Sequence, residues 1–164
     1  SLSQEYSVTM ETLQAAVNAN KNQKERIGKK LDRLVSGGIR GKKIAILGLA
    51  FKANTDDVRE SSSIDLIKFI LDQGGFVNAY DPIANESMAK IFNDIRYSDN
   101  VYDAVYEVDA LVIMTEWNEF RALDLNRIKK SMRNNYVLDT RNVLSMKELS
   151  EQGFVYDNIG RIKI

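Results

Sequence analysis

Short apolar runs alternate with helix-like segments from Lys42 onward, and this alternation constrains the fold more than any other feature of the sequence. The runs IAIL and ALVIM are apolar on both faces, as parallel strands covered by helices on each side must be. Strands that alternate with helices over short links predict a doubly wound α/β fold with a mostly parallel sheet of about six strands. The expected strands are residues 43–47, 76–80, 95–97, 110–114, 136–138 and 154–156, and the expected helices are 62–73, 83–92, 101–107, 125–132 and 146–152.

A long amphipathic helix is expected before the sheet, over residues 1 to about 36. This segment has no proline and one glycine, and its apolar stripe has a polar middle at Asn20 and Lys24. The sequence SGGIRG, residues 36–41, ends the helix and indicates a hinge or boundary, so we expect two units, 1–38 and 39–164. The stripe consists of Tyr6, Met10, Leu13, Val17, Ile27, Leu31 and Leu34.

Composition argues against several functional classes. The 23 basic and 23 acidic residues cancel, so no overall field attracts nucleic acid or an anionic membrane. The chain has neither cysteine nor histidine, which excludes thiolate nucleophiles, disulfides and zinc–thiolate sites and leaves no metal site to expect. No apolar run approaches the roughly 20 residues of a membrane span, and the first residues do not resemble a signal peptide. A cytoplasmic protein is therefore expected.

The loop GLAFKANTDDVRESSS, residues 48–63, follows the first expected strand, at the edge where open α/β sheets bind ligands. It contains one glycine and no G-x-G-x-x-G, so a pyrophosphate pressed against bare backbone is not expected here. Lys52 and Arg59 can instead bind phosphate through side-chain charge. The alternative is that both pair with acidic neighbours on a solvated turn, and the sequence leaves both readings open. The acidic neighbours are Asp56, Asp57 and Glu60, and one of the serines 61–63 should cap the next helix.

Other strand ends add groups to the same edge. Asp81 of AYDP is expected to cap the turn at Pro82 rather than to hold a ribose, and Trp117 of MTEWNEF to act as a packing anchor. Arg141 of LDTRN adds a third positive charge to Lys52 and Arg59 on one rim. No nucleophile with an attendant base can be assembled, so no catalytic residue is assigned and a binding domain is predicted.

The ordered motifs GLAFKANTDDVRESSS, YDP, TEWNEF, DTRN and IGR resemble the carboxyl-terminal, UDP-binding domain of the UDP-glucose 6-dehydrogenase and nucleotide-sugar dehydrogenase family. The segment VNANKNQKERIGKKL resembles the end of the long helix that links that family's central and terminal domains. The resemblance extends over essentially the whole chain. It implies that residues 1–38 are a linking and dimerisation helix and that residues 39–164 are a UDP-sugar-binding α/β domain.

The resemblance also implies roles for individual residues. Phe51 and Lys52 correspond to a pair that contacts the UDP-sugar, and Arg141 to an arginine of the substrate site. Arg59, in the RES motif, corresponds to an arginine that reaches toward the pyrophosphate of NAD. Thr140 stands where many UDP-glucose enzymes have glycine, which leaves a UDP-N-acetylhexosamine as an alternative substrate.

By the same resemblance, the complete enzyme oxidises the C6 hydroxyl of UDP-glucose to a carboxylate, using two NAD and a covalent thiol-linked intermediate. Its NAD-binding domain and catalytic cysteine lie upstream of this sequence, so the fragment alone is expected to be inactive and to form a homodimer through its helix. Two alternatives from other classes stay open at this point. They are an independent dinucleotide-binding regulator with a dimerising helix, and a structural interaction module.

Overall fold

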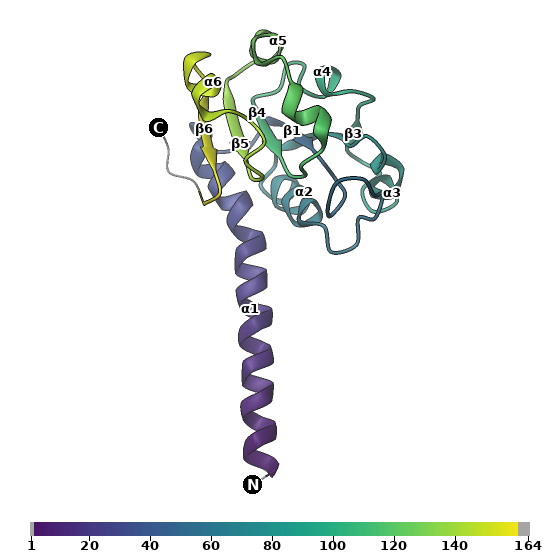
Figure 1. Ribbon diagram of the computed structural model, residues 1–164, viewed down its shortest axis with the longest axis vertical. Coiled ribbons are helices and arrows are strands. Elements are labelled where there is room, and N and C mark those ends of the chain that lie inside the picture. Colours follow the sequence, from purple (N-terminus) through teal and green to yellow (C-terminus); the bar gives the residue numbers. More distant parts are fainter. Residues whose placement is uncertain (1, 161–164) are drawn as a thin grey trace.

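The computed structural model describes residues 2–160, except for the side chains at positions 2, 3, 20 and 24. A long helix, α1 (Leu2–Leu34), projects from an α/β body like a rod (Figure 1). The body contains six strands in the order β3-β2-β1-β4-β5-β6, and all five strand pairings are parallel. This order confirms the predicted doubly wound fold, with the switch point between β1 and β4. The strands are β1 (Lys43–Leu47), β2 (Phe76–Tyr80), β3 (Arg96–Tyr97), β4 (Ala110–Ile113), β5 (Tyr136–Asp139) and β6 (Val155–Asn158).

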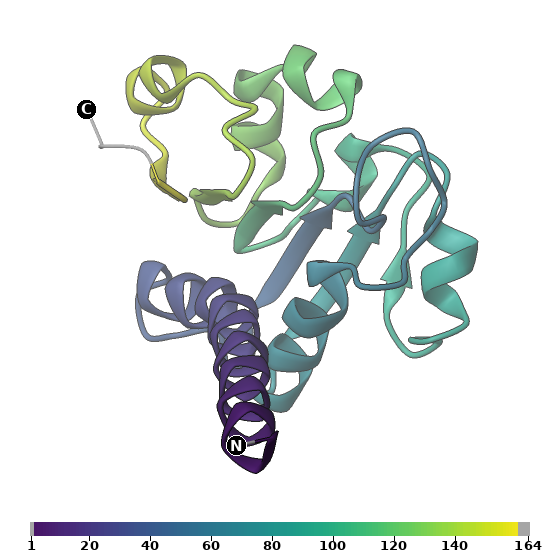
Figure 2. The same ribbon diagram turned by 60° about the horizontal axis from the view of Figure 1, so that its bottom comes forward.

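Helices cover both faces of the sheet, which explains why the central strands are apolar throughout. One face packs against the inner part of α1, α2 (Ser62–Asp72) and α3 (Asn85–Ala89) (Figure 2). The other face packs against α4 (Val101–Ala104), the 3-10 helix η1 (Asn118–Ala122), α5 (Leu125–Ser131) and α6 (Met146–Glu151). Alternate side chains of β1 enter opposite cores, with Ile44 and Ile46 on the first face and Ala45 and Leu47 on the second.

Four of the body's helices begin with a side-chain cap. Ser61 accepts a hydrogen bond from the amide of Ser63, which confirms that one serine of the RESSS sequence caps α2. Equivalent caps start α4, α5 and α6 at Asn100, Asp124 and Ser145.

Several helices and strands begin or end at residues other than the predicted ones. Helix α3 is shorter than the predicted 83–92, because Asp81 and Asn85 build a turn before it: the Asp81 carboxylate accepts from the amides of Ile83 and Ala84. β3 has two residues, β5 continues to Asp139, and β6 begins one residue later and ends two residues later than predicted. η1 was not predicted at all.

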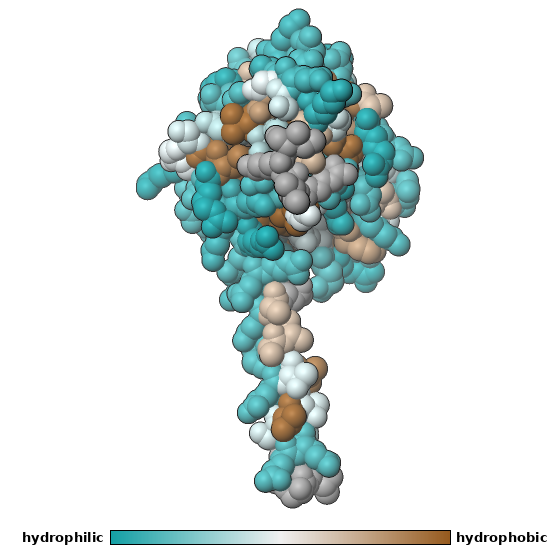
Figure 3. All heavy atoms as spheres, turned by 60° about the vertical axis from the view of Figure 1, so that its left-hand side comes forward, coloured by the Kyte–Doolittle hydropathy of each residue, from teal (hydrophilic) through white to brown (hydrophobic). Residues whose placement is uncertain are grey.

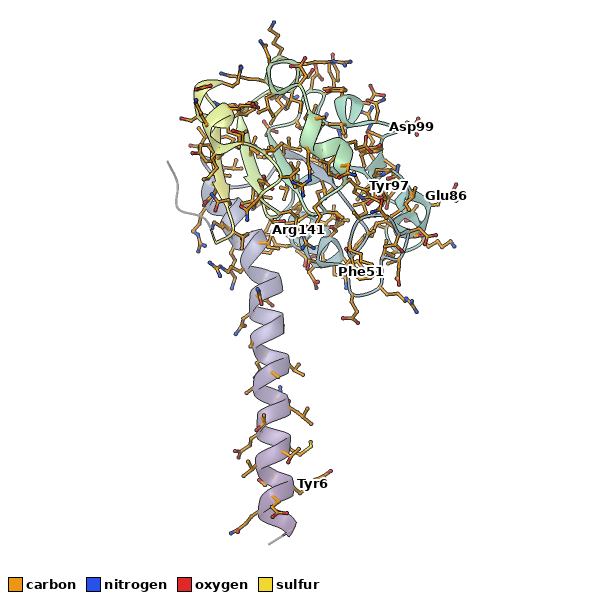
Figure 4. The ribbon with its side chains drawn as sticks, viewed as in Figure 1. Tyr6, Phe51, Glu86, Tyr97, Asp99 and Arg141 are labelled. Carbon is orange, nitrogen blue, oxygen red and sulfur yellow. The ribbon has the colours of Figure 1, made fainter. Side chains whose placement is uncertain are left out.

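The two halves of helix α1 differ in how far their apolar side chains are buried. In the outer half, residues 2–22, the apolar side chains are exposed, from Tyr6 at 70% to Met10 at 51% (Figures 3 and 4). In the inner half, residues 23–34, Leu31 is fully buried and Ile27 and Leu34 are partly buried against the sheet. The predicted polar middle at positions 20 and 24 falls on side chains outside the described part of the chain.

Candidate functional site

The single glycine of the first loop is required for packing. Gly48 has a φ of 97°, and a Cβ on it would lie 2.5 Å from the Cβ of Thr115, which follows β4. A side chain is therefore excluded both by the backbone conformation and by the neighbouring strand end. The glycine lets the ends of β1 and β4 approach closely at the switch point.

The amides that follow Gly48 are occupied by a buried carboxylate. Leu49 and Ala50 donate to Asp81 Oδ2 at 2.7 and 3.1 Å, while Asp81 Oδ1 accepts from Ile83 and Ala84, both at 3.0 Å. Asp81 is 2% exposed. Backbone donors occupy both of its oxygens, which confirms a structural role. The same bonds remove the two amides that a dinucleotide turn would offer to pyrophosphate.

Hydroxyl groups bind the carbonyls of the same loop. Ser63 donates to Gly48 O at 2.9 Å, Ser61 to Leu49 O at 2.7 Å and Thr115 to Ala50 O at 3.0 Å. The residues before Phe51 are thus fixed on both their donor and acceptor sides. These hydrogen bonds fix the position of residues 48–50, which directly precede Phe51 and Lys52.

The segment after β4 occupies the carboxyl edge beside β2. Trp117 donates its indole N–H to Asp81 Oδ2 at 3.2 Å, and Phe120 is fully buried in the second core. Tyr80 donates to Glu119 Oε1 at 2.9 Å, and burial together with that carboxylate raises the pKa of the Tyr80 phenol. Trp117 is therefore a packing anchor as predicted. The edge beside β2, where a dinucleotide fold holds its adenosine ribose, carries protein side chains here.

Arg59 takes part in a local ion pair. Its Nε and Nη2 donate to the two oxygens of Asp57 at 3.0 and 2.8 Å, and 88% of the arginine side chain is exposed. The hydrogen bonds from Arg59 lower the pKa of Asp57 to about 2. For Arg59, the structure thus contains the local pairing that the sequence left open as the alternative. Asn54 and Glu60 flank this part of the loop in the left-handed region, at φ 66° and 60°.

Lys52 and Phe51 project from the same loop. The Lys52 ammonium lies 5.3 Å from the centre of the Phe51 ring, within the range of a cation–π contact, and Phe51 is 39% exposed. Among residues 2–160 no ion pair involves Lys52, unlike Arg59. An aromatic surface and a positive charge therefore stand together at the carboxyl edge.

Arg141 reaches this loop from the end of β5. Its Nε donates to Met114 O at 3.0 Å, and its Nη2 lies 3.5 Å from Phe51 O. Asp139 supports the turn by accepting from the amides of Arg141 and Leu144. Figure 4 shows Arg141 and Phe51 at the lower margin of the body, with Arg141 close to where α1 leaves it. The structure thus brings Arg141 to the Phe51–Lys52 segment, although 90 residues separate Phe51 from Arg141.

Beside Arg141 lies a cleft of about 220 Å³. Lys52 and Arg59 do not line it; Arg59 borders a separate shallow groove with Phe51, Asp57 and Glu60. Of the three predicted cations, only Arg141 therefore lines this cleft. The cleft is lined by Gln23, Arg26, Ile27, Ser62, Met114, Thr140, Arg141 and Ile159.

Two lining residues, Gln23 and Arg26, were missed by the sequence reasoning. They lie on the helical face that also carries Ile27, since positions 23, 26 and 27 are three and four residues apart. That spacing was a usable signal for a shared face, but it does not say which strand end the face meets. Arg161 of the predicted IGR motif lies outside the described residues.

Other kinds of site find no support in the described chain. Across residues 2–160, no three acidic, histidine or cysteine side chains gather where a metal ion could bind. Nor does that part of the chain contain a helix with the length and apolar character needed to cross a membrane.

Known proteins that are similar to this chain in sequence and in structure include sugar-nucleotide dehydrogenases. The sequence is 41% identical over 158 residues to the UDP-glucose 6-dehydrogenase of Rhizobium meliloti, a match that covers 96% of this chain and 36% of that protein. The structure is similar to the UDP-glucose dehydrogenase of Pyrobaculum islandicum, with a TM-score of 0.73 and 29% identity over 88% of this chain and 31% of the other. It is also similar to the NDP-N-acetyl-D-galactosaminuronic acid dehydrogenase of Methanosarcina mazei, with a TM-score of 0.70 and 30% identity over 85% and 29% of the two chains.

The chain spans about a third of the length of the curated relatives it matches. Residues 45–146, more than half of the sequence, match the family described as "UDP-glucose/GDP-mannose dehydrogenase family, UDP binding domain". That range begins in β1 and ends at the start of α6, so it contains the first loop, the Asp81 turn and Arg141. The chain therefore belongs to the UDP-binding domain of the UDP-glucose/GDP-mannose dehydrogenase family.

Proposed function

We propose that this chain is the nucleotide-sugar-binding part of an NAD-dependent UDP-glucose 6-dehydrogenase, which converts UDP-glucose to UDP-glucuronate and reduces two NAD. The observation that carries the proposal is the contact of Arg141 with the loop of Phe51 and Lys52 at the carboxyl edge of the sheet. Glucose is favoured as the sugar because the similar curated proteins, at 34–44% identity, are named UDP-glucose 6-dehydrogenases.

Phe51, Lys52 and Arg141 are the proposed substrate-binding residues. Two carbonyl oxygens orient the guanidinium of Arg141, which can then form parallel hydrogen bonds to a phosphate or to sugar oxygens. Lys52 supplies a second positive charge, and the exposed Phe51 ring offers an apolar surface to a base or sugar. Ordering a flexible loop on binding costs free energy. Here the hydrogen bonds of residues 48–50 hold the loop in place before the ligand binds, which lowers that cost.

A UDP-N-acetylhexosamine is the second candidate substrate. Thr140 directly precedes Arg141 and lines the cleft, with its hydroxyl donating to Ile113 O at 2.6 Å. The similar Methanosarcina mazei structure is of an N-acetylgalactosaminuronic acid dehydrogenase. Replacing Thr140 with glycine should therefore alter the discrimination between UDP-glucose and UDP-N-acetylhexosamines if this position contributes to sugar choice.

NAD would accept hydride from the sugar when bound. The first loop of this chain does not fit its pyrophosphate, because Asp81 occupies the amides of Leu49 and Ala50. Arg59 does fit an accessory role: Asp57 accepts from Nε and Nη2 of its exposed guanidinium, and the guanidinium carries further N–H donors. We propose that Arg59 contacts NAD held mainly by a separate domain.

Residues 1–38 are proposed to be a linking and dimerisation helix and residues 39–164 the UDP-sugar-binding domain. The exposed apolar side chains of the outer half of α1 support a homodimer through this helix. The chain by itself should lack dehydrogenase activity, because its sequence contains no cysteine to form a thiol-linked intermediate.

Isothermal titration calorimetry of the purified chain with UDP tests the proposal. We expect measurable UDP binding, weakened about tenfold in Arg141→Ala and in Lys52→Ala, because each change removes a charge-assisted contact. Arg133→Ala is the matched control, since Arg133 is an exposed arginine at the opposite edge of the sheet, next to the start of β5. Tighter binding of NAD than of UDP would instead favour an independent dinucleotide-binding regulator. Loss of affinity in Arg133→Ala equal to that in Arg141→Ala would contradict the proposed site.

A further inference from the structure

The charged residues that line the cleft beside Arg141 are all positive, although the whole chain is neutral. Of its eight lining residues two are arginines, Arg26 from α1 and Arg141 from the end of β5, and none is acidic. Within residues 2–160 neither arginine forms an ion pair, whereas Arg59 and Lys30 both do. Two positive charges that face one cleft without a carboxylate repel each other, and an anion between them would relieve that repulsion.

Contacts with the body of the protein also hold the segments that carry the two arginines in place. Ile27, the neighbour of Arg26, packs against the core of the body, which holds this face of α1 toward the cleft. Lys30, one turn further, donates to Asn158 O at 2.5 Å and lies 3.6 Å from Asp157 Oδ1, so α1 is attached to the end of β6 beside the cleft. Arg141 is oriented by Met114 O. Arg26 and Arg141 therefore project from two firmly docked elements.

The size of the cleft limits the ligand. Small-molecule sites commonly enclose roughly 300–1,000 Å³, and this cleft, at about 220 Å³, is smaller. It suits a phosphate or diphosphate group better than a whole nucleotide sugar. The hydroxyl of Ser62 and the amide of Gln23 add neutral hydrogen-bonding groups to the lining.

We propose that Arg26 and Arg141 together form a subsite for a phosphate or diphosphate group, so that α1 contributes directly to ligand binding. Where this group is the diphosphate of UDP, the inference rests on the proposed function and extends it to a residue of the long helix. Where it is a free phosphate or pyrophosphate, the subsite stands independently. In both cases, anion binding requires that the inner half of α1 stay docked on the body.

The test measures the binding of inorganic pyrophosphate and of UDP, separately, by calorimetry at two salt concentrations. We expect Arg26→Ala to weaken pyrophosphate binding about tenfold, Arg26→Glu to weaken it further, and Arg26→Lys to restore part of the affinity. Arg26→Ala should also reduce the dependence of affinity on salt, which the loss of a merely structural contact would not do.

Arg33→Ala is the matched control, because it removes the same charge from the same helix at an exposed position outside the lining. Equal pyrophosphate affinities in Arg26→Ala and the unaltered chain, or equal losses in Arg26→Ala and Arg33→Ala, overturn the inference. Failure of the unaltered chain to bind pyrophosphate overturns it as well. Binding of pyrophosphate without binding of UDP supports the subsite and counts against the proposed function alone.

Discussion

The two halves of α1 carry the same kind of apolar stripe and meet opposite environments. In the outer half Tyr6, Leu13 and Val17 are 57–70% exposed, whereas in the inner half Leu31 is fully buried. Both halves belong to one continuous helix, as Figure 1 shows. An amphipathic sequence thus makes one face of a helix suitable for burial, but that face is buried only where a partner element packs against it.

The inner half also has features that the outer half lacks. Gly28 is buried against α2, where a Cβ would lie 2.5 Å from Cγ of Phe69. Lys30 is bound to the end of β6, and its side chain is 19% exposed. In the outer half, Lys21 is 73% exposed and 4.0 Å from Glu25. The inner half is thus attached by a close helix crossing and a shielded charge, in addition to apolar burial.

The largest expected difference between the halves concerns their leucines. Leu31→Ala should lower the free energy of unfolding by about 2–5 kcal/mol, because it leaves a cavity in a packed core. Leu13→Ala, in the outer half, should change it by no more than about 0.5 kcal/mol. Urea denaturation followed by circular dichroism measures both. Equal costs at dilute protein concentration would mean that the outer half is also buried in the folded chain.

The second largest loss of stability is expected from a substitution at Gly28, where α1 crosses α2. Gly28→Ala places a methyl group against the Phe69 ring and should destabilise the chain by about 1–3 kcal/mol, despite the higher helix propensity of alanine. Adding Phe69→Ala should remove the clash, so the Gly28→Ala change in that background should be neutral or stabilising. A double-mutant cycle of unfolding free energies gives this coupling. Additive changes in unfolding free energy would show that the added methyl group does not clash with Phe69.

The outer half should have its own measurable effect on self-association. Leu13→Glu should weaken any dimer of the chain about tenfold or more, since it puts a charge into the apolar stripe. Gln14→Glu adds the same charge at the next position, off the stripe, and should change association little. Sedimentation velocity over a range of concentrations compares the two variants. A dimer equally weakened by both substitutions would argue against contact through the stripe.

The smallest difference is expected between the two lysines. Lys30→Met should cost about 1 kcal/mol, because it leaves Asn158 O and the part-buried Asp157 without this donor. Lys21→Met should have almost no effect, since exposed pairs one helical turn apart contribute only about 0.3–0.5 kcal/mol. Thermal unfolding of the two variants tests the ranking, and a larger loss in Lys21→Met would refute it.

Much of the α/β body could be predicted because its signals are local. The runs IAIL and ALVIM are apolar at every position, which only strands buried on both faces require, and the structure places them at β1 and β4. The serine cap of α2 and the turn at Asp81 were likewise predicted, because a capping side chain bonds amides a few residues away.

The candidate site was predicted less completely, because its contacts join distant parts of the chain. The sequence placed Lys52, Arg59 and Arg141 on one edge, and the structure brings Arg141 to the carbonyl of Phe51. It did not indicate that Asp81 takes the amides of Leu49 and Ala50, more than 30 residues away. Arg26 was missed for the same reason, since its distant neighbours in the cleft come from the start of α2 and from the residues that follow β4, β5 and β6.

The doubly wound architecture, the long helix and the family could all be inferred from residue order, since periodicity, capping residues and ordered motifs are local features of the chain. Three features depend on how the chain folds in space: the half of α1 that is covered, the occupation of the first loop's amides by Asp81, and the cleft that Arg26 shares with Arg141. Burial, hydrogen-bond partners and neighbouring charges depend on distances through space, and local residue order does not specify those distances.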